Sequence, residues 1–403
     1  MRVSTQIIFD QNMKSMSQQQ SAFMKVGNQL ATGRRVVNIS DDPQAASRAV
    51  NVQQSKATTQ QMLDARVSAR NNLSQQESVL NGLGDMITRS KTLLVQASNG
   101  AMSELDKASI AAELEGLYEA MIGQANVTDG VGRFLFAGQK DDSAPVVKID
   151  GRAQFVADIV PREQFIDDNR KMTVRDTAER VFAAAPGSTT YHVKVDSANQ
   201  GTLVVNSTNV LDTTNPQFGE KFTVAFADDG AGGLTYSITT AAGEQATGAF
   251  NAGDAIEFGG LRFATSGTPS AGDSFTAGRA AEMDPNLFRT MEDVIQQLRQ
   301  PLETDEQRAA QRNVLSESMR ELDHMLDNIL TRRASVGSRL NELDTLDLVG
   351  NNRLLAYEQT LSDLVDLDYV KAASDYSMRM IGLQAAQKTF VDIKGMNLFD
   401  YLR

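Results

Sequence analysis

Residues 315–343 read LSESMRELDHMLDNILTRRASVGSRLNEL, and the apolar residues in this stretch recur at alternating steps of four and three. Such spacing places side chains on one stripe of a helix, and another helix must cover that stripe. The pattern is interrupted at Arg333, Asp347 and Gly350, then returns in the same register up to Leu364. It therefore predicts a long coiled helix to about residue 365. The residues on the stripe are Leu315, Met319, Leu322, Leu326, Ile329, Val336, Leu340, Leu343, Leu354, Tyr357, Leu361 and Leu364.

The N-terminal part of the chain carries a second stripe of this kind. Leu73, Leu80, Ile87 and Leu94 recur every seven residues. Asp42-Pro43 is a helix start signal and Asn99-Gly100 is a break, so we predict helices over about 43–98 and 104–127. Each buried stripe residue contributes about 1.5–3 kcal/mol. We expect residues 43–127 to pack antiparallel against 305–365 of the same chain, with pairing to another copy as the alternative.

The outermost segments have shorter and interrupted stripes, which one pair of helices cannot fully cover. We predict that residues 1–32 and 366–403 are poorly ordered in the free monomer and become ordered on assembly, because short isolated helices are marginal in water. Their apolar residues are our candidate assembly interface: Phe9, Met13, Met16, Phe23, Leu30, Tyr369, Tyr376, Met380, Leu383, Phe390, Leu398, Phe399 and Leu402.

The middle of the chain loses the helical period and gains strand and turn signals. Residues 191–195 and 222–226 are β-branched or aromatic runs with alternation, and 255–263 reads as a hairpin around Gly259-Gly260. An antiparallel sandwich or barrel-like unit is expected here. The predicted fold class is mainly α with inserted β, a long antiparallel helical bundle or coiled-coil rod from both termini plus a central β-rich domain. We place a terminal coiled-coil domain at 1–40 and 366–403, a helical rod domain at 41–143 and 284–365, and a β-rich outer domain at 144–283.

Composition argues against several classes of function. The chain has 403 residues, a formal net charge of −12, no cysteine and two histidines, His192 and His324. An acidic chain is a poor partner for nucleic acid or an anionic membrane. Two distant histidines leave little material for a metal site or a histidine-based triad, so we expect both to be scaffold residues, and we expect no enzyme activity and no cofactor. We interpret Asp141-Asp142 and Asp228-Asp229 as solvated turns. The N-terminal apolar run is too short for a signal peptide, and no stretch approaches the ~20 apolar residues of a membrane span.

Several motifs together resemble the flagellin superfamily, and within it the hook–filament junction proteins. The resemblance covers about the first 140 and the last 120 residues well, and the centre in part. The N-terminal signature is Met1–Thr5, Gln29–Arg35 (QLATGRR) and Ser40–Pro43 with Ala45-Ala46. The other matching stretches are Asn126–Gly138 (NVTDGVGRFLFAG), Phe258–Phe275, Gly382–Gln387 (GLQAAQ) and Gly395–Leu402 (GMNLFDYL).

The resemblance implies a structural subunit that joins the hook of the bacterial flagellum to its filament. It implies a homo-oligomeric ring between hook-associated protein 1 and the flagellin or filament-cap side, with the terminal helices inside and the β domain outside. It also implies an extracellular location, export through the flagellar type III apparatus without a cleaved signal peptide, and an export chaperone bound near the C-terminus. A flagellin-type filament subunit is the alternative within the superfamily. An adhesin on a coiled stalk is the alternative outside it.

Overall fold

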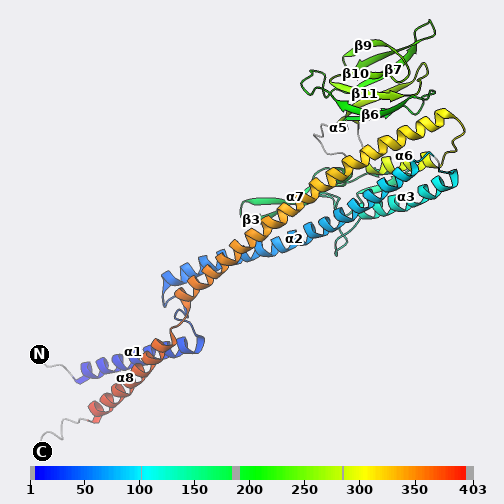
Figure 1. The fold of residues 1–403 in the computed structure, drawn as a ribbon. Coiled ribbons are helices and arrows are strands. Elements are labelled where there is room, and N and C mark those ends of the chain that lie inside the picture. Colours follow the sequence, from blue (N-terminus) through cyan, green and yellow to red (C-terminus); the bar gives the residue numbers. More distant parts are fainter. Residues whose placement is uncertain (1–4, 101, 184–190, 284–285, 396–403) are drawn as a thin grey trace, which may run out of the picture. The chain divides into compact units, whose positions relative to one another are not determined.

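The computed structural model describes residues 5–100, 102–183, 191–283 and 286–395. It divides into two compact units. One unit comprises Met1–Asp64 with Thr345–Arg403, and the other comprises Ala65–Asp344. Both units are built mainly on long helices, and the strands all belong to the second unit (Figure 1).

Long helices account for both ends of the described chain, as the seven-residue pattern predicts. The two longest, α2 and α7, are continuous over 55 and 61 residues and contribute to both units. The prediction of long terminal helices around a β-rich centre is confirmed. The helices are α1 (Thr5–Thr32), α2 (Pro43–Ala97), α3 (Glu104–Ala125), α4 (Ala178–Phe182), α5 (Ala280–Met283), α6 (Leu287–Leu298), α7 (Asp305–Val365) and α8 (Tyr369–Gly395).

Helix boundaries fall where local chemistry requires them. Asp42 Oδ1 accepts a hydrogen bond of 3.0 Å from the backbone N–H of Ala45, which satisfies a free donor of the first turn of α2. Pro43 begins that helix, where its missing N–H costs nothing. Gly33 follows α1 with a φ of 70°, the left-handed conformation that glycine adopts without strain. Ser103 caps α3 by accepting from the N–H of Asp106.

In the second unit, α2 and α7 pack antiparallel and bury the predicted stripes against each other. The stripe side chains Leu73, Leu80, Ile87, Leu94, Leu315, Leu322, Ile329, Val336 and Leu343 are at most 3% exposed. Ion pairs flank them at Arg70–Asp344 and Lys91–Asp323, which are 21 residues apart on both helices. Three heptads separate these pairs on each helix, so the register of the coiled pair is maintained between them. Helices α3 and α6 complete the bundle, with the rings of Tyr118 and Phe288 in edge contact.

The central strands form an antiparallel sandwich, one of the two arrangements expected. The first sheet has the order β5-β12-β7-β8-β9, and the second has the order β10-β11-β6. Their facing side chains form one buried core that includes Phe222, Phe226, Phe263 and Phe275. The strands are β5 (Tyr191–Val195), β6 (Val204–Val210), β7 (Phe222–Asp228), β8 (Leu234–Thr240), β9 (Gly243–Phe250), β10 (Ala255–Phe258), β11 (Leu261–Ser266) and β12 (Ser274–Arg279).

Two separate hairpins precede the sandwich in the chain. They are β1 (Val146–Ile149) with β2 (Arg152–Phe155), and β3 (Arg162–Asp167) with β4 (Arg170–Arg175). The second hairpin is tied to the helical bundle, because Arg66 of α2 donates to the backbone oxygen of Ile166 at 2.8 Å and Gln76 of α2 donates to that of Val174 at 2.5 Å. Backbone groups of a short hairpin are therefore satisfied by side chains of the long helix.

The interpretation of Asp141 as part of a solvated turn is wrong. Its side chain is 15% exposed and lies in a cluster of ions around Arg175, whose own side chain is 5% exposed. Arg175 Nη1 lies 2.8 Å from Asp141 Oδ2, and Arg175 Nη2 lies 2.5 Å from Asp129 Oδ2. Arg162 and Asn72 also contact this cluster. A buried guanidinium needs such partners, because an unpaired buried charge is costly.

Candidate functional site

The candidate assembly surface is carried by α1 and α8 of the first unit, which lie side by side (Figure 1). The two helices are antiparallel, and the chain segments at their joined ends pair with each other. Arg34 and Asp366 form an antiparallel bridge, and the Leu367 N–H donates to the Gly33 oxygen at 3.0 Å. The left-handed Gly33 thus ends α1 and aligns the chain for pairing with the residues that precede α8.

Charged side chains hold the segment between α1 and α2 in place. Arg35 contacts Asp42 Oδ2 at 3.1 Å and donates to the Leu364 oxygen at 2.5 Å, and Lys25 contacts Asp41 Oδ1 at 3.0 Å. Hydrogen bonding from the backbone N–H of Asn38, and then from Lys25, lowers the pKa of Asp41. Backbone and arginine donors act in the same direction on the pKa of Asp42. Both carboxyls are therefore ionised at neutral pH, which favours these contacts.

Aromatic and small side chains make the contact between the two helices. The rings of Phe23 and Tyr376 lie 4.7 Å apart, centroid to centroid, at an interplanar angle of 32°. Gly27 faces the same tyrosine, and a Cβ there would lie 3.7 Å from Tyr376 Cε2. Gly382 of α8 faces Gln19 of α1 in the same manner. Small residues opposite larger ones bring the helix backbones close together.

The predicted interface residues take three different positions. Phe23 and Tyr376 meet directly, and Met16, Leu30, Leu383 and Phe390 are half-buried on the same two helices. Met13, Tyr369 and Met380 are 44%, 58% and 40% exposed. The side chain of Phe9, and all of Leu398, Phe399 and Leu402, lie outside the described residues.

A second apolar face on these helices was missed by the sequence reasoning. Its members are more than half exposed: Ile7 and Met24 on α1, and Val370, Met378, Ile381 and Val391 on α8. At 100° per residue, the α8 members fall within about 80° of Val370, whereas Tyr376, Leu383 and Phe390 fall on the other side of the helix. Apolar residues that recur at helical spacing outside the seven-residue stripe are the signal that could have revealed this face. The α1–α8 pair therefore has one apolar face turned inward. On the outward side of α8 the four exposed apolar residues, called the outward apolar face below, are interspersed with exposed polar residues such as Ser377 and Lys388.

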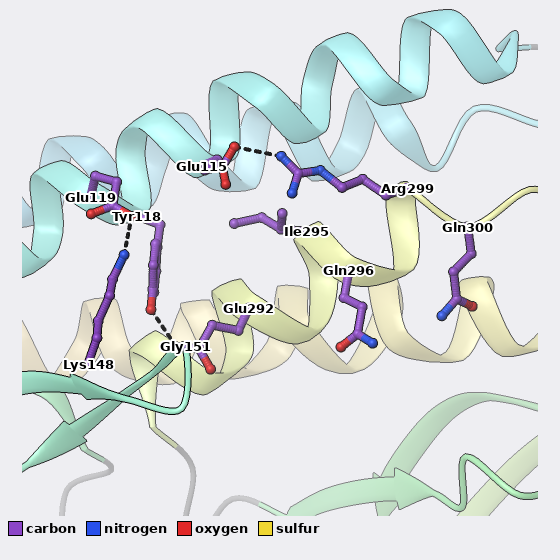
Figure 2. A pocket seen from close by; sticks show the side chains of 10 residues that line it. All are labelled: Glu115, Tyr118, Glu119, Lys148, Gly151, Glu292, Ile295, Gln296, Arg299 and Gln300. Atoms are coloured by element: carbon purple, nitrogen blue, oxygen red, sulfur yellow. Dashed lines mark hydrogen bonds and ion pairs between the residues drawn. The ribbon is translucent and has the colours of Figure 1, made fainter.

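The second unit contains a shallow pocket of about 450 Å³ between α3, α6 and the β1–β2 hairpin (Figure 2). The charged groups that line it are paired with one another. Glu115 contacts Arg299 at 2.6 Å, Lys148 pairs with Glu119, and the hydroxyl of Tyr118 donates to Glu292. Burial and the adjacent Glu292 raise the pKa of Tyr118. These pairings connect the helices and the hairpin.

Within the described part of the chain, no three histidine, aspartate or glutamate side chains are arranged to hold a metal ion. No described helix contains an apolar stretch sufficient to cross a bilayer.

The fold and the paired terminal helices define a flagellin-like protein. Residues 3–141 match the family described as the bacterial flagellin N-terminal helical region. Over 407 residues the chain is 31% identical to flagellar hook-associated protein 3 of Escherichia coli K12, with 99% of each chain covered. It is 30% identical over 406 residues to the protein of that name from Salmonella typhimurium, with both chains covered completely. The crystal structure of Xanthomonas campestris FlgL is similar, with a TM-score of 0.67 and 27% identity, covering 77% of this chain and 99% of that one.

The chain belongs to the flagellar hook-associated protein 3 family. The identification suggested by the motifs at the two ends of the sequence is confirmed. The protein is a component of the bacterial flagellum, and its relatives are structural flagellar proteins.

Proposed function

We propose that this flagellar hook-associated protein, which joins the hook to the filament, does so as a ring of identical copies. In this proposal the α1–α8 pair is the surface through which the copies bind one another. The observation that carries the proposal is the outward apolar face of that pair, on which Val370 is 84% exposed, Met378 is 63% exposed and Ile381 is 61% exposed. Burial of such side chains stabilises association by about 25 cal/mol per Å² of apolar area removed from water.

The partners proposed are those that the family resemblance implies. Hook-associated protein 1 would bind one side of the ring, and flagellin or the filament cap would bind the other. The protein would lie outside the cell, having left through the flagellar export apparatus without a cleaved signal peptide. An export chaperone bound near the C-terminus would cover the outward apolar face of α8 before assembly. We assign the chain a structural role and no enzymatic one.

The order of the terminal helices in the free monomer is part of the same proposal. Helices α1 and α8 rest on each other through side chains that are mostly half-buried. Two helices in contact bury little apolar area, and such pairs are marginal in water. We therefore propose that both helices exchange with unfolded conformations in the monomer and become stable in the ring. Strong hydrogen-exchange protection of both helices in dilute monomer would contradict this.

A substitution on the outward face tests the assembly role. Ile381→Asp places a charge on α8 at a position that is 61% exposed, so the α1–α8 contact is retained. In a ring the carboxylate would be buried without a partner, which costs several kcal/mol. We expect the variant to be made and exported at wild-type levels but to be absent from purified hook–filament assemblies, with loss of motility.

Arg379→Asp is the matched control. Arg379 is an exposed, already charged residue of the same helix, and at 100° per residue it lies 180° from Val370, so a carboxylate there should leave incorporation unchanged. Normal incorporation of the Ile381→Asp protein would show that this face is not an assembly surface. Loss of incorporation with both variants would show only that α8 does not tolerate charge.

A further inference from the structure

The two histidines of the chain, 132 residues apart in sequence, lie against each other in the second unit. The rings of His192 on β5 and His324 on α7 are 4.7 Å apart, centroid to centroid, at 63°. His192 is 1% exposed, and neither of its ring nitrogens has a hydrogen-bond partner among the described residues. Its Nδ1 lies 3.9 Å from Glu321 Oε1.

Glu321 of α7 lies beside His192, and Glu317 lies one turn before it on the same helix. Glu317 and Glu321 are four residues apart, so they share one face of the helix. The Glu321 side chain is 16% exposed, and its Oε2 accepts from Thr290 Oγ1 of α6 at 2.5 Å. His192, Glu317, Glu321 and His324 are called the His–Glu cluster below. They occupy the contact between the sandwich, through β5, and helices α6 and α7.

Ionisable groups lie at this contact in a place that water barely reaches. Water is excluded from His192, and a charge there has no hydrogen-bonded partner to offset its desolvation. The geometry therefore favours the sandwich resting on the helices while the cluster is uncharged.

We propose that the contact of the β sandwich with α6 and α7 is proton-gated, closed while Glu317 and Glu321 hold protons and loosened as they ionise. This inference does not depend on the assembly role proposed above. It concerns the second unit alone.

The glutamates set the direction of the effect. Burial, and then the adjacent Glu321, raises the pKa of Glu317 from 4.5 to about 8, and burial also raises the pKa of Glu321. A carboxyl with a raised pKa stabilises the closed contact fully below the pKa it has when exposed. That stabilisation is lost as the pH rises toward the pKa in the closed state. These groups therefore loosen the contact between about pH 4.5 and pH 8.

The histidines act in the opposite direction at lower pH. Burial, and then the charge of His324, lowers the pKa of His192 from 6.5 to about 4, and burial lowers the pKa of His324. A base with a lowered pKa weakens the closed contact as the pH falls from about 6.5 to about 4. The two effects oppose each other below pH 6.5. Above pH 6.5 the histidines are neutral and the glutamates set the direction, so opening of the contact should rise between pH 6.5 and pH 8.

Other charged groups face the cluster from each element packed around it. Lys194 of β5, Arg289 of α6 and Arg320 of α7 favour ionised glutamates. Asp293 of α6 opposes them, and burial raises the pKa of Asp293 as well. Asp323 and Asp327 of α7 favour protonated His324. These charges act in both directions, and burial remains the largest cause of the shift for all four members of the cluster.

Amide hydrogen exchange on the full-length protein, with EDTA present, measures the opening. Val205 is the reporter, because its N–H donates across the contact to Asn313 Oδ1 of α7 at 3.1 Å. Val224 of β7, inside the five-stranded sheet, is the reference. We expect the protection factor of Val205 to fall several-fold from pH 6.5 to pH 8, while that of Val224 changes much less.

Glutamine variants test the assignment, because glutamine has the shape and neutrality of a protonated glutamate. In the double variant Glu317→Gln, Glu321→Gln, the protection factor of Val205 should no longer fall as the pH rises. The single variant Glu317→Gln should show a smaller fall, and it provides a second test should the double variant fail to fold. Glu358→Gln, on the same helix at a side chain that is 58% exposed, should behave as wild type. The proposal would be overturned if the protection factor of Val205 in the wild type did not change with pH, or if that of Val224 fell equally. It would also be overturned if the protection factor of Val205 fell as much in the glutamine variants as in the wild type.

Discussion

The ring of Tyr376 on α8 lies 4.7 Å from the ring of Phe23 on α1, and this contact joins the two ends of the chain. The two residues are separated by most of the sequence, yet each is placed by its own seven-residue repeat. Gly27, one turn beyond Phe23, lies beside the same tyrosine. The stability of the terminal pair should therefore depend on these positions.

Phe23→Ala should loosen α1 from α8. The ring is half-buried, so the expected loss is about 1–3 kcal/mol, less than for a fully buried phenylalanine. Exchange rates of amides in α1 and α8 should rise, and those of the second unit should stay unchanged. Met24→Ala is the control, because Met24 is 57% exposed and the substitution should alter exchange little. If both variants changed amide exchange in α1 and α8 equally, the aromatic contact would not be the main contribution to the stability of the pair.

Gly27→Ala should stabilise the terminal pair. Alanine is favoured over glycine in a helix interior by about 0.5–1 kcal/mol, and the new Cβ would lie at ordinary contact distance, 3.7 Å, from Tyr376. Slower amide exchange in α1 is the expected result. Faster exchange in the variant would show that the helices approach more closely at Gly27 than the structure has them.

Gly33→Ala should destabilise the terminal pair, the opposite of the effect expected for Gly27→Ala. The φ of 70° costs an L-residue about 1–2 kcal/mol, and a Cβ would lie 2.7 Å from the Tyr369 hydroxyl. We expect faster exchange at the ends of α1 and α8 in this variant. Gly123→Ala, in the interior of α3 with open space at its Cβ, is the control and should be neutral or stabilising.

Arg175→Met should destabilise the second unit by about 3–5 kcal/mol. The change removes the cation of Asp129 and leaves Asp141 with only the more exposed Arg133 and Arg162. Removing one partner of a buried ion pair costs more than the pair itself contributes to stability. A lower urea midpoint is the expected observation. Arg170→Met removes an arginine that is 59% exposed and pairs with Glu342, so its effect should stay within about 1 kcal/mol. Similar midpoints for the two variants would contradict the importance of the buried cluster.

Local sequence signals account well for the helices and strands. Gly33, Asp42-Pro43 and Asn99-Gly100 mark helix ends because their chemistry acts within a few residues. The 315–343 pattern predicts both the length of α7 and the side that it buries. Gly259-Gly260 predicts the turn between β10 and β11, where both glycines have positive φ.

Contacts between distant parts of the chain were not predictable in this way. Asp141 resembles a turn residue locally, but Arg175, 34 residues away, brings it into a buried cluster. His192 and His324 carry no local sign of their contact, because it depends on how a strand of the sandwich rests on α7. The outward face of α8 was missed for a related reason. Stripe analysis finds the residues that a helix buries within its own chain, and the remaining apolar residues show their exposure only in the folded pair.

The protein joins hook and filament, and immunogold electron microscopy of flagellated cells can show its position directly. Antibodies should be raised against the sandwich and applied to intact flagella, with a strain lacking the protein as the control. One cluster of label is expected at the junction of hook and filament on each flagellum. Label along the whole filament would contradict it and indicate a filament subunit instead.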